Sequence, residues 1–307
     1  MLLEEVLEWL DIKPSGIYVD ATTGAAGHSA AIAKRMVSLA SPEPPSGRLI
    51  SLDRDARALQ IARDRLQGFG NLVTLVRSPF SRIAEAVQEL GIAKVDGVLA
   101  DLGVSSMQFD QPERGFSFRE AGPLDMRMSS GEAEEDTLTA DEIVNQWSEK
   151  EIADLLYTEA EEHDSRRIAR SIMNARPIRD TAHLATVVAG GRKARGRQKL
   201  HPATKTFLAL RIAVNREEEA LGQFLSRSPA TLNPGGRLIV LSYHSLEDRV
   251  VKHTFQDLAR SGGYQVLTKK IILPGDAEIA ANPRSRSAKM RVLEKTATAE
   301  SQAPWMQ

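Results

Sequence analysis

Polar side chains follow directly on several short apolar runs of this sequence, where an open α/β sheet binds its ligands. The run 17–19 ends at Asp20, and the turn that follows carries Gly24 and Gly27. Backbone N–H groups and the start of a helix at such a turn favour a polar or anionic ligand group. The next apolar run ends at Asp53, whose carboxylate can accept hydrogen bonds from both hydroxyls of a ribose. Together these features predict a nucleoside site. The simpler alternative is that Asp53 only caps the next helix.

The glycine spacing distinguishes between the nucleoside ligands that use such a turn. A dinucleotide needs the pattern G-x-G-x-x-G to bring the backbone close to its pyrophosphate. Here the turn holds Gly24 and Gly27 only, after the acidic strand end Asp20. An adenosyl ligand without phosphates needs less, so the spacing favours S-adenosylmethionine over a nicotinamide cofactor.

Two further candidates for chemistry stand after later runs. Asp101 ends the apolar run 95–100, where its carboxylate can accept a hydrogen bond from an amine or hold the cofactor's methionine portion. His244 follows the run 237–242 and could orient a base or take a departing proton; a packed, neutral histidine is the alternative. We expect the two strands to be neighbours in the sheet, so that both residues face the same crevice.

The elements that must position these residues follow the βαβ pattern of a parallel sheet. The pattern stops after the fourth strand, and polar, helix-patterned sequence takes its place until about residue 200. We therefore predict one discontinuous α/β domain, 1–108 and 201–295, with an inserted helical domain, 109–200, and a disordered tail, 296–307. The expected strands are 17–20, 49–52, 72–76, 95–100, 237–242, 269–273 and 289–293, a turn occupies 233–236, and the expected helices include 29–39, 143–147, 152–157, 168–175 and one long helix at 203–224.

Composition excludes several classes of function. The 307 residues contain no cysteine, which removes disulfides, thiolate metal sites, iron–sulfur clusters and a cysteine nucleophile for C5 methylation of cytosine. We predict no metal. No apolar segment reaches the roughly 18 residues of a membrane span, and the N-terminus carries Glu4, Glu5 and Glu8 where a signal peptide is positively charged. A cytoplasmic protein without a membrane partner is expected.

Two basic runs free of acidic residues interrupt a chain whose formal net charge is −1. Such runs supply contacts to nucleic-acid phosphates, and a solvated loop is the alternative. The first consists of Arg192, Lys193, Arg195, Arg197 and Lys199, and the second of Arg284, Arg286, Lys289 and Arg291.

Several long blocks of the sequence resemble the family of bacterial ribosomal RNA small subunit methyltransferases H, which methylate the N4 amine of a cytidine. The resemblance covers nearly the whole chain, and its most specific blocks are 101–106, 113–118, 122–127, 201–204, 242–249 and 282–287. It implies a Rossmann-like class I methyltransferase sheet with a helical domain inserted after the fourth strand.

The resemblance also implies which residues hold S-adenosylmethionine. Asp53 would bind the ribose, Phe80 would lie beside the adenine, and Asp101 and Gln108 would lie near the methionine end. The first turn would contribute Ala26, Gly27 and His28, although the family usually has glycine where this chain has Ala26.

The function implied is methylation of a specific cytidine in 16S ribosomal RNA, as free RNA or in the assembled small subunit. Asp101 and His244 are the catalytic candidates, and Phe116 or Phe118 could stack on the splayed-out base. A monomer and a homodimer both remain open. The rival functions are a nicotinamide dehydrogenase and an RNA-binding assembly factor without methyl transfer.

Overall fold

The computed structural model describes residues 1–129, 138–192 and 201–297. Its contacts divide the chain into two compact units: Met1–Gly103 with Glu219–Gln307, and Val104–Glu218. The second unit is therefore inserted in the chain after the fourth strand. None of the helices in the described ranges combines the length and the apolar character that a membrane crossing requires.

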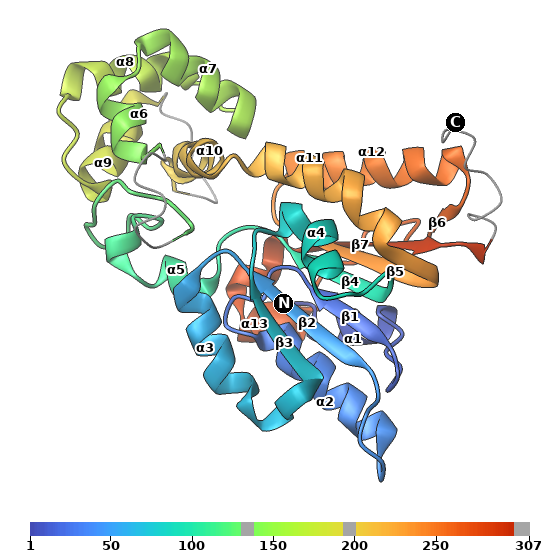
Figure 1. Ribbon diagram of the computed structural model, residues 1–307. Helices are drawn as coiled ribbons and strands as arrows, with labels where there is room; N and C mark the ends of the chain where they lie inside the picture. Colours follow the sequence, from blue (N-terminus) through green and yellow to red (C-terminus); the bar gives the residue numbers. More distant parts are fainter. Residues whose placement is uncertain (130–137, 193–200, 298–307) are drawn as a thin grey trace. The chain divides into compact units, whose positions relative to one another are not determined.

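The first unit is built on a seven-stranded sheet with the order β3-β2-β1-β4-β5-β7-β6 (Figure 1). The pairs from β3 to β5 are parallel, and β7 runs antiparallel to both β5 and β6. The predicted Rossmann-like α/β sheet is confirmed. Its strands are β1 Ile17–Asp20, β2 Arg48–Asp53, β3 Val73–Arg77, β4 Val95–Asp101, β5 Leu232–Ser242, β6 Tyr264–Val266 and β7 Lys289–Lys295.

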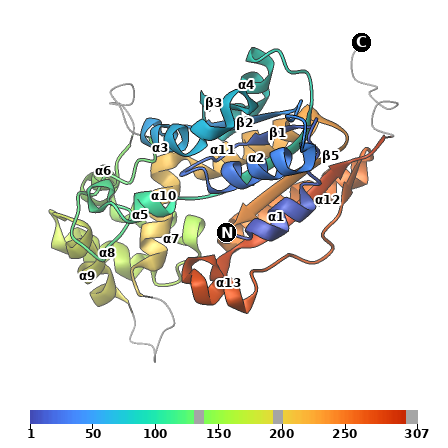
Figure 2. The same cartoon turned by 90° about the horizontal axis from the view of Figure 1, so that it is seen from below.

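Helices cover both faces of this sheet (Figures 1 and 2), because successive side chains of each strand point to opposite faces. Val19 packs with one core, under α4, α11 and α12, and its neighbour Tyr18 packs with the other, under α1 and α2. Both faces of the strands are therefore apolar, as in other parallel sheets. The helices of this unit are α1 Leu3–Trp9, α2 Gly27–Ala40, α3 Ala56–Leu66, α4 Ile83–Glu89, α11 Glu217–Arg227, α12 Ser245–Ser261 and α13 Asp276–Ala281, with short 3₁₀ segments η1 Gln67–Leu72, η2 Phe80–Arg82, η5 Ser228–Thr231 and η6 Pro283–Ser287.

The prediction of a strand at 269–273 is wrong. Only Ile272 of that segment pairs with the sheet, through an isolated bridge to Met290. Before it, the hydroxyl of Thr268 accepts the N–H of Val292 at 3.0 Å, so a side chain replaces the backbone acceptor that a continuing strand would supply. The short strand β6 precedes this interruption instead of following it.

The expected turn at 233–236 lies within β5. Leu232 pairs with Val95 and Arg237 with Gly97, so the four residues between them interrupt the pairing with β4, and Gly235 has φ 78°. The expected long helix at 203–224 is broken, because Arg216 adopts a left-handed conformation with φ 49°. At the other end of the chain, the N–H of Thr296 donates to Gly263 at 2.9 Å, and residues 298–307 of the expected tail lie outside the described residues.

The second unit is helical, and its described residues contain no strand. Side-chain caps define several helix starts: Thr139 with Glu142, and Ser148 with Glu151, form reciprocal capping boxes. Helix α10 belongs to this unit, because its residues Phe207 and Leu210 are buried in the helical core. The sequence analysis assigned this segment to the α/β domain, which is therefore wrong. The elements are α5 Ser106–Phe109, η3 Pro112–Arg114, α6 Ala140–Gln146, α7 Glu149–Ala160, α8 Ser165–Ala175, α9 Thr181–Gly191 and α10 Thr204–Asn215.

Candidate functional site

The carboxyl ends of β1, β2, β4 and β5 bring the expected site residues of the first unit to one edge of the sheet. β4 lies between β1 and β5, and Asp101 is in register with Leu241 near the end of β5. The expectation that the strands ending at Asp101 and before His244 are neighbours is therefore confirmed.

Asp53 holds the turn after β1 in place. Its carboxylate accepts the N–H of Gly24 at 2.7 Å and the N–H of Asp55 at 2.8 Å. Asp55, and not Asp53, caps α3, since the Asp55 side chain accepts the N–H of Arg57. Burial raises the pKa of Asp53, and the two backbone N–H groups act in the opposite direction. Each carboxylate oxygen has a second lone pair, so Asp53 retains the capacity to accept two further hydrogen bonds.

Ala26 adopts the left-handed conformation at φ 59° and ψ 34°, immediately before α2. A residue with a Cβ is strained there, which explains why glycine suits the position. The Ala26 N–H donates to Thr23 within the turn, at 2.7 Å, and its methyl group packs with Ala62 and Leu66. Gly27, the first residue of α2, is exposed, and a Cβ built there would meet nothing within 4 Å. The open approach to the turn is therefore at Gly27.

Asp20 lies beneath the turn and is fully buried. Its carboxylate accepts the hydroxyl of Ser29 at 2.6 Å, and Ser29 in turn lies 2.9 Å from the hydroxyl of Ser51. Burial raises the pKa of Asp20, while the charge on His28 and the Ser29 hydrogen bond act to lower it. Asp20 therefore joins β1, α2 and β2 below the ligand side of the turn.

Asp101 is the centre of the polar cluster at this edge. Its Oδ1 accepts the hydroxyl of Tyr243 at 2.5 Å, and its Oδ2 lies 3.6 Å from Nδ1 of His28. The Asp101 N–H donates to the hydroxyl of Thr22 at 2.6 Å. The Asp101 side chain keeps 23% of its surface exposed, whereas that of His28 keeps 9%. The cluster therefore combines a carboxylate that a ligand can reach with a half-buried tyrosine that holds it and a buried histidine beside it.

The protonation of His28 follows from its other contact. Nε2 lies 2.9 Å from the carbonyl oxygen of Met1, and a carbonyl can only accept a hydrogen bond. Nε2 therefore carries a proton, and Nδ1 is the nitrogen that faces Asp101.

Tyr243 is the site residue that the sequence analysis missed. Burial, together with the neighbouring charge of Asp101, raises the pKa of Tyr243 far above its ordinary range, so its hydroxyl stays protonated and donates. The Tyr243 N–H donates to Glu247 Oε2 at 3.0 Å, which fixes the residue at the start of α12. The spacing His244-x-x-Glu247 could have indicated this arrangement, because it is the spacing of a capping box.

His244 is engaged in that cap. Its Nδ1 accepts the N–H of Glu247 at 3.4 Å, and its Nε2 lies 3.0 Å from Glu247 Oε1. The structure thus brings His28 and Tyr243 to Asp101 and places His244 at the start of α12, with both ring nitrogens beside Glu247.

Phe80 and Gln108 are placed in different units. Phe80 follows β3, and its ring lies edge-on to Phe224 with the centroids 5.3 Å apart. Ser78, two residues earlier, donates its N–H to the backbone oxygen of Asp53 at 3.0 Å. The segment that leads to Phe80 therefore lies beside the end of β2. Gln108 belongs to the second unit, where its side chain donates to Met128 at 3.0 Å and accepts the Ser105 N–H at 3.1 Å.

The two proposed stacking aromatics serve the core of the second unit. Phe116 is buried there, and Phe118 packs against His201 and Phe207 with centroids 4.6 and 4.8 Å apart. Phe116 therefore offers no open face for stacking of a base, whereas Phe118 is only half-buried and its stacking on a base stays a prediction.

The first basic run begins with a structural residue. Arg192 pairs with Glu162 at 3.3 Å and with Asp164 at 4.0 Å, and it donates to the Pro202 carbonyl at 2.9 Å. Its assignment to a phosphate-binding run is therefore wrong. Lys193, Arg195, Arg197 and Lys199 lie outside the described residues.

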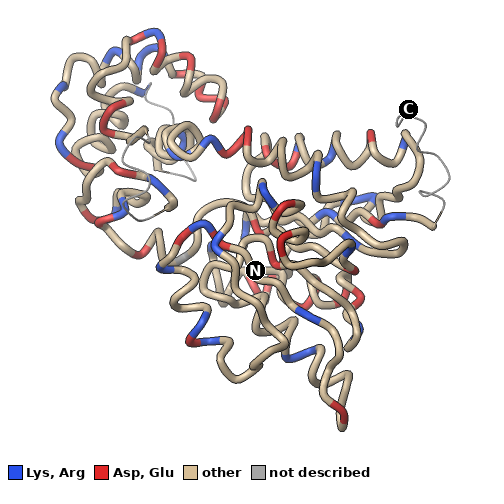
Figure 3. The backbone as a smooth tube through the Cα atoms, in the orientation of Figure 1, with Lys and Arg blue, Asp and Glu red and all other residues tan. Residues whose placement is uncertain are grey.

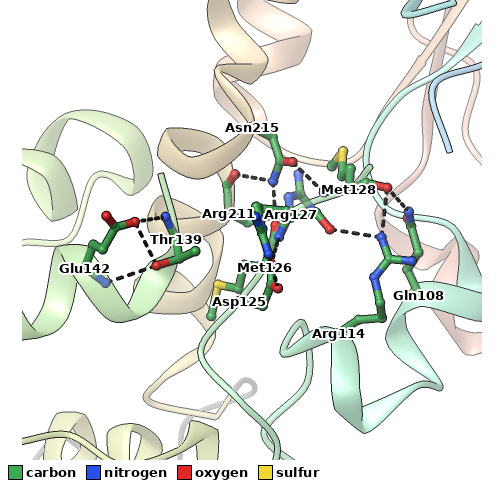
Figure 4. Close-up of polar contacts among 10 residues, drawn as sticks. All are labelled: Gln108, Arg114, Asp125, Met126, Arg127, Met128, Thr139, Glu142, Arg211 and Asn215. Carbon is green, nitrogen blue, oxygen red and sulfur yellow. Dashed lines mark hydrogen bonds and ion pairs between the residues drawn. The ribbon is translucent and has the colours of Figure 1, made fainter. Parts of the chain in front are cut away.

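The sequence blocks 113–118 and 122–127 form the polar frame of the second unit (Figure 4). The Arg114 guanidinium donates to the carbonyls of Arg127 and Met128, and Asn215 of α10 accepts the Met128 N–H at 2.7 Å. Gly115 has φ 75°, and a Cβ there would lie 2.2 Å from the Pro123 carbonyl oxygen. The hydrogen bonds and the close backbone contact at Gly115 therefore explain the residue types of these two blocks.

Comparison with known proteins gives one family and many relatives. The model of the MraW methylase family matches residues 1–296. Each of the following relatives carries the name Ribosomal RNA small subunit methyltransferase H. The protein from a Cyanothece species is 50% identical over 96% of this chain and 93% of its own length. That from Koribacter versatilis is 47% identical over 95% and 91%, and that from Brevibacillus brevis is 43% identical over 96% of each chain.

Proposed function

Because this chain belongs to the MraW methylase family, we propose that it methylates the exocyclic N4 amine of a cytidine in 16S ribosomal RNA, using S-adenosylmethionine. The substrate class rests on the name shared by the relatives. The chemistry rests on one observation: an accessible carboxylate, Asp101, held by Tyr243 at the end of β4.

The donor set of the first unit fits S-adenosylmethionine. Asp53 retains lone pairs for two ribose hydroxyls, and Phe80 supplies an aromatic surface close to it for the adenine. The open space at Gly27 allows a ligand to approach the backbone of the turn, and Asp101 offers a negative charge to the amino group of the methionine portion. No phosphate-binding glycine pattern is present, which agrees with a ligand that has no pyrophosphate.

When bound, S-adenosylmethionine supplies an electrophilic methyl group. The exocyclic amine of cytosine is a poor nucleophile, since its lone pair is delocalised into the ring. Asp101 accepts a hydrogen bond from the amine N–H, which localises electron density on the nitrogen. The Tyr243 hydroxyl occupies Oδ1 and fixes the carboxylate, so Oδ2 is the oxygen that faces the amine.

Methylation of the amine releases one proton, which must leave the site. Asp101 Oδ2 accepts this proton from the amine. Of the two histidines, His28 lies beside this carboxylate, with Nδ1 3.6 Å from Oδ2, whereas the ring nitrogens of His244 lie beside Glu247.

Incubation of the purified protein with methyl-labelled S-adenosylmethionine tests the proposed function. Free 16S ribosomal RNA and purified 30S subunits serve as separate substrates, and mass spectrometry of the nucleosides identifies the product. We expect N4-methylcytidine in at least one of the two. Tight S-adenosylhomocysteine binding without any methyl transfer would favour the assembly-factor function instead.

A further inference from the structure

The block 282–287 near the C-terminus contains residues of two kinds. Asn282 caps η6 by accepting the N–H of Arg284 at 3.2 Å, and Pro283 occupies the first turn, where no N–H is needed. Ser285 is fully buried, and its hydroxyl donates to the Asn282 carbonyl at 2.8 Å. The uncharged residues of the block therefore fix the backbone.

The charged residues of the block differ from the uncharged ones in their exposure. Arg284 and Arg286 are exposed, on either side of the buried Ser285. Arg291, further along, is different: it is buried and forms a two-pronged ion pair with Asp248 at 2.7 and 3.0 Å. Of the second basic run, Arg291 thus stabilises the fold, while Arg284 and Arg286 are exposed residues of η6.

This exposed pair lies at the edge of the sheet that carries the site. Lys289 is in register with Ser242, which directly precedes Tyr243. Met290 pairs with Leu241, which pairs with Asp101, so the Cα atoms of Met290 and Asp101 are about 10 Å apart at the usual strand spacing. The η6 arginines precede this point by a few residues.

A second pair of cations is held beside the start of β7. The Leu267 N–H donates to Val292 at 3.0 Å, and Ile272 exchanges two hydrogen bonds with Met290. Lys269 and Lys270 lie in the short segment between these two attachments, and both are exposed.

Acidic residues are scarce around these cations, although Lys and Arg are interspersed with Asp and Glu along most of the chain (Figure 3). Between residues 258 and 293 the acidic residues are Asp276 and Glu278. Glu278 accepts the N–H of Leu2 at 2.8 Å, so one of its carboxylate oxygens is already hydrogen-bonded. In this stretch of the chain, cationic residues therefore outnumber acidic ones.

We propose that Lys269, Lys270, Arg284, Arg286 and Lys289, here called the β7 basic surface, bind phosphates of the RNA strand that flanks the target nucleotide. The proposal rests on the proposed function, since it names the surface of the first unit that holds the RNA substrate. Phosphate contacts position a nucleic acid without reading its sequence, and exposed arginines provide planar donors that match phosphate geometry.

The test compares RNA binding of the wild type with that of the double variant Arg284→Ala, Arg286→Ala. A short fluorescein-labelled oligocytidylate is titrated at a series of salt concentrations, with anisotropy as the readout. Loss of two phosphate contacts should flatten the slope of log K against log salt by about 1.4, roughly a sevenfold smaller loss of affinity over a fourfold rise in salt. The variant Arg284→Lys, Arg286→Lys keeps the charges and should keep most of the slope.

The matched control is Lys34→Ala, Arg35→Ala, which removes the same charge from exposed positions on α2. An unchanged slope in the Arg284, Arg286 variant would overturn the proposal, and so would equal flattening in the control. Methyl transfer by the wild type, to free 16S ribosomal RNA and to 30S subunits, is measured separately. A flattened slope without methyl transfer would support the surface and reject the function; methyl transfer with an unchanged slope would do the reverse.

Discussion

Replacement of Tyr243 by Phe removes one oxygen atom and with it the 2.5 Å hydrogen bond to Asp101. The ring and its position at the start of α12 should persist, because the Tyr243 N–H is held by Glu247 and not by the hydroxyl. The substitution therefore tests whether the orientation of the Asp101 carboxylate matters for methyl transfer.

The size of the expected effect follows from the kind of hydrogen bond that is lost. A hydrogen bond to a charged group contributes about 1.5–3 kcal/mol. If Asp101 must be oriented in the transition state, kcat should fall by about 10- to 150-fold. The loss should persist at saturating S-adenosylmethionine, since the residue acts on the orientation of the carboxylate that meets the amine.

The assay is methyl transfer to the substrate identified above, with kcat and both KM values determined, and thermal unfolding as a measure of folding. Tyr18→Phe is the matched control. The Tyr18 hydroxyl is also buried and accepts the Lys13 N–H at 2.7 Å, but it lies at the other end of β1. The control should lower stability by about 1–2 kcal/mol and leave kcat unchanged.

A Tyr243→Phe variant that retains the wild-type kcat would refute the reasoning, because the Asp101–Tyr243 pair would then have no role in the reaction. An equal loss of kcat in both tyrosine variants would attribute the effect to folding of the sheet.

Three further predictions concern the first turn. Asp53→Ala should weaken S-adenosylhomocysteine binding by about 1.5–3 kcal/mol in calorimetry, whereas Asp96→Ala, which loses a backbone contact at the opposite edge, should not. Gly27→Ala should leave thermal stability equal or higher, since its Cβ meets nothing, while a methyl group facing the ligand should weaken the same binding by about 1–3 kcal/mol; unchanged affinity would remove Gly27 from the site. Burial raises the pKa of Asp20, so the folded protein holds a proton that the unfolded chain releases near pH 4. The stability that this proton provides is lost as the pH rises through the folded pKa. Urea unfolding should therefore show Asp20→Asn gaining stability relative to the wild type as the pH rises above about 4, and a difference that is constant with pH would contradict the assignment.

The sheet was predictable because its strands are short apolar runs that end in polar residues. Asp20, Asp53 and Asp101 each end such a run, and the parallel order brings them to one edge. Strand type and position follow from this local pattern, as does the glycine-bearing turn.

The failures arose where side chains replace backbone interactions. Thr268 accepts the Val292 N–H and interrupts the expected strand at 269–273, which periodicity does not reveal. Arg192 belongs to a run of cations by sequence, but Glu162 and Asp164, about thirty residues away, neutralise it in the fold. Contacts between residues so far apart in the chain cannot be predicted from composition.

Within the site, the same limit explains why the sequence analysis named His244 and missed Tyr243. Both follow β5, and the sequence analysis chose the histidine because it could orient a base or take a departing proton. The direction of each side chain depends on the helix cap that Glu247 completes, and the cap turns the Tyr243 hydroxyl toward Asp101. His28 lies beside the same carboxylate from the start of α2, and the sheet order explains this contact because β1, which precedes α2, pairs with β4.

The central claim is that Asp101 accepts the hydrogen bond of the target amine, and Asp101→Asn tests it most directly. The substitution preserves shape and removes charge. Turnover is measured at saturating S-adenosylmethionine, alongside calorimetry of cofactor binding, because the same carboxylate also faces the methionine portion. We expect a loss of kcat on the order of 10² or more that saturating cofactor does not restore. A variant that loses only cofactor affinity, and recovers the wild-type rate at saturation, would contradict it.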